Sequence, residues 1–565
     1  MQQHEKEIET AIIIIVDSVR YYRSGVDDRD RLEIMDQFSQ DAVEFTNAFT
    51  SAPSSVMSAA AMFTGMDSCF LARNYNDWEF DNRNVVSLQQ VLEKHDYEIY
   101  TIDNSRVGRE IKRDLTMPIN KKYYPKGISH ANFWTNLELT RILKNVLEMG
   151  VKKKSLFMLW YDCRNDPNTS VAVEQALDLF KEHGLYDDSV MIMTSDHGYP
   201  DPRSGLNKNT MRNMRHDMVV TDDNIKVPLF IKSPGASAYK SKNTVSLVDL
   251  TPTILDLLDV NDNDNDARLK NITGKSLKKK LYKNDNQIKD QRIIRSDTRL
   301  LLQKGRITAL RNNQYKYVIY HDEEKFELFD IETDPNELAP LIVDDYLDIV
   351  EIFDSFFKKQ QSVIDKFHIE DLESRVVPLI TYIQKNKIKR VLISTEAPKI
   401  ILDPIVNNIK SCDNSIVIDY LSKNKVQHCE HIFNKVFTIE DTKKMDQYDL
   451  SIIVNEKSHF NFDNPLIYKI CEQHSRKSIS LDYNLKMYSR FMAKWVYPVL
   501  KYRKNWYFYK QEPILILKDI WKLASLGFKI HVLKDKTKSP DMQIVKQLRD
   551  RAMAAQKEKE SAQGK

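Results

Sequence analysis

Glycine is scarce in this chain of 565 residues, which contains 13 of them. A chain so poor in glycine is not expected to use glycine-rich phosphate loops as its main binding device. No G-x-G-x-x-G segment accompanies its strand-like runs, so dinucleotide binding has no support. The sequence also lacks an apolar run of about 18 residues, the length that a membrane-spanning helix needs.

Cysteine is also sparse, and the net charge is small. The five cysteines are odd in number and form no C-x-x-C pair: Cys69, Cys163, Cys412, Cys429 and Cys471. This pattern argues against a disulfide framework and fits a reducing compartment. Because the polar N-terminus shows no signal-peptide pattern, we predict a cytoplasmic protein. The 84 basic and 81 acidic residues leave a net charge of +3, so nucleic acid is not an expected partner.

Continuous apolar runs are present, and several end in polar residues. They cover residues 11–16, 155–161, 189–195 and 227–231, with helical patterns at 137–149 and 171–183. Strands that alternate with helices predict an α/β fold with a largely parallel sheet. Ligands bind beyond the carboxyl ends of such strands, where Asp17 and Asp196 follow their runs. We therefore expect both aspartates to be functional.

Chemistry-bearing residues are spread over four segments. Asp17 directly follows the first run, and Ser55 begins a stretch of small, helix-favouring residues. Asp196 and His197 precede Gly198, and His216 lies in the segment that follows. Carboxylates with imidazole suit a zinc-like or manganese-like ion. A serine hydroxyl on that ion, at a helix N-terminus that favours an anionic ester, would become a nucleophile.

The order and spacing of these segments resemble the sulfatase-type branch of the alkaline phosphatase superfamily. The shared pattern is a strand that ends in Asp, then S-A-P-x-nucleophile before a helix that ends in T-G, then D-H-G. It continues with V-P-L-x-I-x-x-P-G at 227–235, a D-x-x-P-T helix at 246–258, G-x-S-L at 274–277, and K-Y followed by D-P-x-E at 315–337. The resemblance covers roughly residues 8–345 and implies an alkaline phosphatase/sulfatase-like catalytic domain.

The resemblance implies roles for particular residues. Asp17, Ser55, Asp196 and His197 would hold one divalent ion, with zinc or manganese preferred and calcium as an alternative. His216 would lie near the transferred group. Alternatively, it would be a solvated histidine in a loop without a role in the site. Arg20 occupies the position of the arginine in a D-S-x-R pattern of the family. Its side chain would either contact the substrate or form a structural ion pair with a carboxylate. Arg164 stands where the family has a substrate-binding His, and an arginine can clamp a phosphate.

Departures from the family pattern decide the predicted chemistry. Met57 and Ala59 replace the Pro or Ala and the Arg of the signal for converting the nucleophile to formylglycine. Ser18 replaces the second Asp of the usual Asp-Asp pair. We therefore predict that Ser55 stays a serine, as in the phosphoethanolamine transferases, which residues 55–64 resemble. The alternative is that Ser55, or the adjacent Ser54, only caps a helix.

We predict four regions: a catalytic domain at 1–345, a helical linker at 346–385, a smaller C-terminal α/β domain at 386–540 and a polar tail at 541–565. The preferred function is hydrolysis or transfer at a phosphate ester through a serine phospho-enzyme. The alternatives are a sulfuric ester hydrolase and a degenerate sulfatase-fold binding module. The expected substrate is a small-molecule or glycan- or lipid-linked phosphoester. The aromatic and basic stretch at 491–510 leaves a peripheral membrane contact open beside core packing.

Overall fold

The computed structural model describes most of the chain between residues 8 and 488. The described residues are 8–21, 32–71, 84–103, 135–163, 166–200, 219–260, 266–282, 292–298, 307–321, 323–395, 399–422, 433–438, 444–455, 470–471, 473–482 and 487–488. They fall into two compact units, the first made mainly of residues up to Lys387 and the second mainly of Ile388–Glu396 and Ser415–Asp482.

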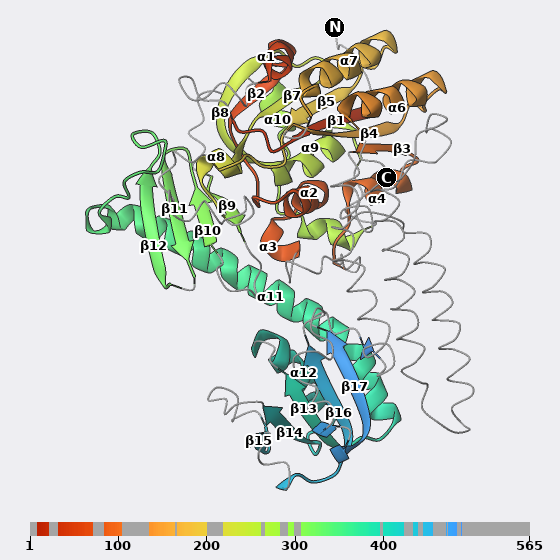
Figure 1. Ribbon diagram of the computed structural model, residues 1–565, viewed down its shortest axis with the longest axis vertical. Coiled ribbons are helices and arrows are strands. Elements are labelled where there is room, and N and C mark those ends of the chain that lie inside the picture. The colour runs from red at the N-terminus through yellow and green to blue at the C-terminus, as the bar shows by residue number, and fades with distance from the viewer. Residues whose placement is uncertain are drawn as a thin grey trace, which may run out of the picture. The chain divides into compact units, whose positions relative to one another are not determined.

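The first unit is built on a sheet of eight described strands in the order β3-β4-β1-β5-β7-β2-β6, with β8 paired to β2 (Figure 1). The parallel part contains β3 (Glu98–Asp103), β4 (Ser155–Asp162), β1 (Thr10–Asp17) and β5 (Val190–Thr194). Beyond β5, β7 (Leu229–Lys232) runs antiparallel to β5 and β2 (Val43–Phe49), while β8 (Tyr239–Ser246) runs parallel to β2. The expectation of an α/β fold with a largely parallel sheet is confirmed.

Residues 227–231, expected to form one strand, belong to two. The short β6 (Lys226–Val227) pairs with β2, and β7 begins at Leu229. Pro228 separates them because proline has no backbone N–H to donate to a strand ladder. Its carbonyl accepts a hydrogen bond from the Thr194 hydroxyl at 2.7 Å, which ties the break to the end of β5.

Helices cover both faces of the parallel strands. One face carries α6 (Asn136–Glu148) and α7 (Thr169–Glu182), and the other carries α2 (Ser55–Thr64) and α9 (Leu250–Leu257). Ile12, Ile14 and Val16 of β1 share a buried cluster with α6 and α7. Ile13 and Ile15 share a second cluster with α2 and α9. The apolar run of β1 is continuous because both of its faces are buried.

Shorter helices complete this unit. They are α1 (Glu33–Phe38), η2 (Ser39–Asp41), α3 (Ser68–Leu71), α4 (Leu88–Lys94), α8 (Asp222–Ile225), η5 (Leu247–Asp249), η6 (Ala267–Asn271), α10 (Lys278–Tyr282) and η7 (Val343–Tyr346). The long helix α11 (Leu347–Lys385) and α12 (Lys399–Cys412) follow along the chain.

A second, antiparallel sheet in the first unit has the order β12-β11-β10-β9. Its strands are β9 (Ile294–Asp297), β10 (Ile307–Arg311), β11 (Tyr315–Tyr320) and β12 (Lys325–Asp330). Buried charges join this sheet to α8. Lys316 Nζ lies 2.8 Å from Glu337 Oε1 and 3.1 Å from Asp222 Oδ1, and Arg311 Nε lies 3.2 Å from Asp222 Oδ2. The K-Y and D-P-x-E segments thus supply the two ends of one ion pair.

The second unit contains a six-stranded sheet in the order β15-β14-β13-β16-β17-β18. The strands are β13 (Arg390–Thr395), β14 (Val417–Ser422), β15 (Val436–Thr438), β16 (Tyr448–Asn455), β17 (Ser475–Asp482) and β18 (Met487–Tyr488). All pairs are parallel except β17 with β18. A buried cluster that includes Leu392, Leu421 and Ile453 forms the core of this sheet.

Several predictions fall partly or wholly outside this description. The 491–510 stretch and the 541–565 tail lie outside the described residues. The cytoplasmic location stays a prediction. Among the described helices, none combines the length and the apolar character that a bilayer crossing demands. Among the described residues, Cys69, Cys163, Cys412 and Cys471 form no disulfide.

Candidate functional site

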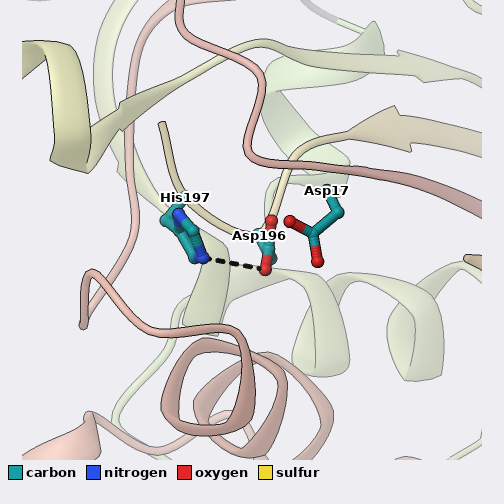
Figure 2. A group of neighbouring side chains, drawn as sticks. All are labelled: Asp17, Asp196 and His197. Atoms are coloured by element: carbon teal, nitrogen blue, oxygen red, sulfur yellow. Dashed lines mark ion pairs between the residues drawn. The ribbon is translucent and has the colours of Figure 1, made fainter. Parts of the chain in front are cut away.

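Three acid and imidazole groups meet where β1 and β5 end. Asp17 is the last residue of β1, and Asp196 and His197 follow β5, its parallel neighbour. One ligand atom from each residue lies within 4.8 Å of the others (Figure 2). The carboxyl ends of adjacent parallel strands meet at one edge of a sheet, so two sequence segments about 180 residues apart supply one cluster.

The turn after β1 aligns the two aspartates. Ser18 has a φ of 63°, in the left-handed region that non-glycine residues rarely occupy. In this conformation its backbone N–H donates to Asp196 Oδ1 at 3.0 Å, and its hydroxyl donates to Asp17 Oδ1 at 2.6 Å. Ser18, which stands where a second Asp was expected from the resemblance, therefore orients both carboxylates.

The hydroxyl of Ser55 points into this cluster. Ser55 is the first residue of α2, and its Oγ lies 3.0 Å from His197 Nε2 and 3.4 Å from Asp17 Oδ2. Ser54 holds the N-cap position, and its side chain makes no capping hydrogen bond. The first backbone N–H groups of a helix have no acceptor within the helix, so this end of α2 offers donors beside the Ser55 hydroxyl.

The ring of His197 has a defined tautomer. Its Nδ1 lies 2.6 Å from the carbonyl oxygen of Gly198. A carbonyl only accepts, so in the neutral ring Nδ1 carries the hydrogen and Nε2 presents a lone pair. That lone pair faces the Ser55 hydroxyl and is available to a metal ion.

Asp196 is fully buried, and its charge is incompletely compensated. Burial raises the pKa of Asp196 to about 6, and the nearby Asp17 carboxylate adds to the rise. Its Oδ2 is 3.3 Å from His197 Nε2 but receives no hydrogen bond. A buried carboxylate oxygen without a donor is costly unless a cation compensates it. The residues present therefore fit a divalent ion held by Asp17, Asp196 and His197, with Ser55 Oγ beside them.

Gly198 allows the loop after β5 to pack against the loop around α8. A Cβ atom at this position would lie 2.1 Å from the carbonyl oxygen of Asp223. The backbone N–H of Gly198 donates to Asn224 O at 2.8 Å, and that of Tyr199 donates to Asp223 O at 3.1 Å. Only glycine permits this close backbone approach, which fixes the position of the preceding His197.

Sequence reasoning did not identify several residues around this cluster. Ser58 donates to the carbonyl oxygen of Asp196 at 2.6 Å, and Ser195 Oγ accepts from Val19 N at 2.9 Å. The indole Nε1 of Trp160 lies 3.4 Å from Asp17 Oδ2. No spacing signal marks these contacts, because they join segments that are distant in sequence. Only the proximity of Ser58 to Ser55 and of Ser195 to Asp196 offered a hint.

The remaining predicted site residues have different outcomes. His216 and Arg164 lie outside the described residues, so their assigned roles stay predictions. Arg20 is half-buried three residues after Asp17, and its role also stays a prediction.

Family models match the part of the chain that contains the D-H-G segment. The sulfatase model matches residues 168–260. The model for the C-terminal region of N-sulphoglucosamine sulphohydrolase matches residues 215–362, which include the antiparallel sheet.

Individual relatives agree with these matches. Bovine arylsulfatase K is 28% identical over 194 residues, which cover 33% of this chain and 32% of that protein. Lipoteichoic acid synthase 2 of Bacillus subtilis is 35% identical over 100 residues, covering 16% of this chain and 14% of the synthase. The chain therefore spans a third or less of the length of these curated relatives. The crystal structure of a candidate sulfatase from Bacteroides thetaiotaomicron matches 63% of this chain and 93% of that one, with 16% identity and a TM-score of 0.50, a likeness of fold.

Proposed function

We propose that this chain, which resembles the sulfatase-type branch of the alkaline phosphatase superfamily, is a metal-dependent hydrolase whose substrate is a sulfate ester. The observation that carries the proposal is the position of Ser55 Oγ, at the first residue of α2 and 3.0 Å from His197 Nε2. A tetrahedral anionic ester at this point would meet backbone donors on one side and a nucleophile on the other. The names of the relatives support sulfate over phosphate as the first substrate class.

The proposed cofactor is one divalent ion held by Asp17, Asp196 and His197. The imidazole favours zinc or manganese, whereas carboxylate and hydroxyl oxygens also suit calcium. When bound, such an ion lowers the pKa of a coordinated hydroxyl and stabilises negative charge on the ester oxygens. Asp196 Oδ2, buried without a donor, supports this assignment.

A carboxylate of the chain itself can accept the nucleophile's proton. Asp17 Oδ2 lies 3.4 Å from the Ser55 hydroxyl, whereas the lone pair of His197 Nε2 is left to the metal ion. As the proton leaves, a bond forms from Oγ to the sulfur, and the bond from sulfur to the alcohol oxygen breaks. The leaving oxygen takes the proton that Asp17 accepted and departs as the alcohol. Water then attacks the sulfur, which releases inorganic sulfate and restores the Ser55 hydroxyl. Ser55 and Asp17 are only partly buried, so the ester can reach them from solvent.

A metal-binding measurement tests the site before any substrate is known. Purified full-length protein should bind about one equivalent of zinc, manganese or calcium, measured by calorimetry and elemental analysis. We expect Asp196→Asn and His197→Ala to lose most of this affinity, because each removes one of about four ligands. A full equivalent of tightly bound metal in both variants would refute the ligand assignment. An absence of metal binding by the unaltered protein would favour a degenerate binding module.

A phosphate ester is the second candidate substrate, and the residues around Ser55 favour it. Met57 and Ala59 are buried in α2, where formylglycine-type sulfatases carry their maturation signal. An unmodified Ser55 would transfer phosphate through a serine phospho-enzyme. The similarity to a lipoteichoic acid synthase also extends the set of relatives beyond sulfatases.

Two measurements separate these candidates. The first compares hydrolysis of an aryl sulfate with that of an aryl phosphodiester by metal-loaded protein, with Ser55→Ala as the control. The second is the mass of the peptide that contains Ser55. A mass lower by two hydrogen atoms indicates oxidation to the aldehyde, whose hydrate would then supply the attacking hydroxyl in place of the serine, and supports the sulfate candidate. An unmodified serine together with turnover of the phosphodiester alone would replace the first candidate by the second.

A further inference from the structure

A chain of buried hydroxyl groups connects the loop before α2 to the loop after β5. Thr50 Oγ1 lies 2.8 Å from Ser58 Oγ, and Ser58 Oγ lies 2.6 Å from the main-chain oxygen of Asp196. Thr50 is completely buried, and Ser58 is 1% exposed. These contacts therefore operate out of water, where a hydrogen bond is strong and an unmade one is costly.

The direction of this chain follows from its last acceptor. The Asp196 carbonyl has no proton to give, so the Ser58 hydroxyl must donate to it. The Ser58 oxygen is then left as an acceptor for the Thr50 hydroxyl. Ser58 N also donates to Ser54 O at 2.8 Å, so Ser58 is bound into the first turn of α2. One side chain therefore joins the helix that carries Ser55 to the backbone of Asp196.

Asp196 is held from the other side as well. Ser18 N donates to its carboxylate, and Ser195 Oγ donates to His197 O at 2.7 Å while it accepts from Val19 N. The loop after β5 is thus tied to β1 by Ser18 and Ser195 and to α2 by Ser58. The Ser58 contact is thus a hydrogen bond that links α2 directly to the backbone of this loop.

We propose that Ser58 is a positioning residue, which holds the Asp196 carboxylate and the Ser55 nucleophile in one fixed relation. Its loss leaves the buried Asp196 carbonyl without its hydroxyl donor and frees the loop to shift against α2. The consequence is weaker metal binding together with a misplaced nucleophile. This inference rests on the proposed metal-dependent function, but it concerns a residue that touches neither metal nor substrate.

A buried serine can also contribute only to core packing, without positioning any site residue. A control variant in the same helix tests this alternative. Thr64 is 1% exposed, lies in the same helix and donates to Ala60 O at 2.8 Å. Thr64→Val therefore deletes a comparable buried hydroxyl in α2 whose hydrogen bonds stay within the helix and the turn that directly follows it. A purely structural role for Ser58 predicts the same behaviour for Ser58→Ala and Thr64→Val.

The test measures metal affinity in the full-length protein by calorimetry with zinc, manganese and calcium, beside the unfolding temperature. For Ser58→Ala we expect about 10- to 100-fold weaker binding of the ion that the unaltered protein binds best. Thr64→Val should retain normal affinity. Ser58→Cys keeps a weak hydrogen-bond donor of similar size, so its metal affinity should lie between those of the unaltered protein and Ser58→Ala. If Ser58→Ala does not fold, the affinity of Ser58→Cys tests the proposal instead.

The outcomes separate this inference from the proposed function. Equal metal affinity in Ser58→Ala and the unaltered protein overturns the positioning role and leaves the metal site intact. Equal losses in Ser58→Ala and Thr64→Val also overturn it, because the effect would then come from α2 as a whole. If the unaltered protein binds none of the three ions, the proposed function fails first and the inference fails with it.

Discussion

Ser54 and Ser55 are adjacent hydroxyls with very different surroundings. Ser54 has an extended backbone at the N-cap, without a capping hydrogen bond from its side chain. Ser55 Oγ instead faces His197 Nε2 and Asp17 Oδ2. A hydroxyl becomes a strong nucleophile only when a base or a metal ion removes its proton, and only Ser55 has those groups in reach.

We therefore expect Ser55→Ala to lower the turnover of the preferred ester at least about a thousandfold, while metal binding persists. Ser54→Ala should change turnover by less than about tenfold, because its side chain caps nothing. Steady-state kinetics of both variants on the same substrate provide the comparison. Near-normal turnover by Ser55→Ala, or a dead Ser54→Ala beside an active Ser55→Ala, would move the nucleophile elsewhere.

At the scale of elements, the site depends on the contact between the loop after β5 and helix α8. The loop after β5 carries Asp196 and His197, and the backbone N–H groups of its next two residues donate to carbonyl oxygens of Asp223 and Asn224 in α8. The contact leaves no room for a side chain at Gly198, where a Cβ would lie 2.1 Å from Asp223 O. Either this loop or α8 must move if any side chain is added at Gly198.

Gly198→Ala should therefore weaken metal binding by at least about tenfold, because His197 directly precedes the displaced residue. Gly274→Ala is the matched control, since its Cβ would lie 2.1 Å from Val248 O, away from the metal ligands. We expect Gly274→Ala to lower the unfolding temperature but to bind metal normally once folded. Calorimetric titration measures the metal affinity of both variants. Equal affinities would show that the close backbone approach at Gly198 serves packing alone.

The sequence predicted the elements that carry the site better than it predicted the bonds that align them. The apolar run of β1 and the position of Asp17 at its end follow from local pattern, because a buried parallel strand must be apolar on both faces. The roles of Ser58 and Trp160 depend on which strands and helices become neighbours. The break at Pro228 shows the same limit, since a run of apolar residues does not reveal which strand pairs with each half.

At the scale of the whole first unit, buried charges join α8 to the antiparallel sheet. Glu337 is 3% exposed, and its Oε1 accepts from Asp222 N at 2.7 Å and from Lys316 Nζ at 2.8 Å. Burial is the main cause that raises the pKa of Glu337 to about 7 from an ordinary value of 4.5, while Lys316 opposes the rise. Between a pH of about 4.5 and about 7, the folded protein therefore retains a proton on Glu337 that the unfolded chain has released.

The sign of the pH effect follows from this difference. The contribution of Glu337 to the free energy of unfolding is complete below a pH of about 4.5 and is lost as the pH rises through about 7. Glu337→Gln removes this linkage and should flatten the stability curve in that window, by at most about 1.4 kcal/mol per pH unit. Urea unfolding at several pH values measures the slope.

Glu148→Gln serves as the control for that experiment, because Glu148 lies on the exposed surface of α6 with a side chain that is 54% exposed. Its slope should match that of the unaltered protein. If Glu337→Gln also gives an unchanged slope between pH 4.5 and 7, the proton is not held by Glu337 in the folded state.

The contact between Trp160 and Asp17 also gives the protein an optical reporter. Trp160 is the one tryptophan among the described residues, although the chain has 6, and its indole Nε1 lies 3.4 Å from Asp17 Oδ2. A divalent ion is the largest local charge in such a site, so its arrival should alter the fluorescence of the adjacent indole. Titration with metal should therefore shift the emission, and Trp160→Phe should abolish the shift while affinity measured by calorimetry stays within about tenfold. A shift of equal size in Trp160→Phe would assign the signal to another tryptophan. The same indole would let stopped-flow mixing time the loading of the site before any substrate is known.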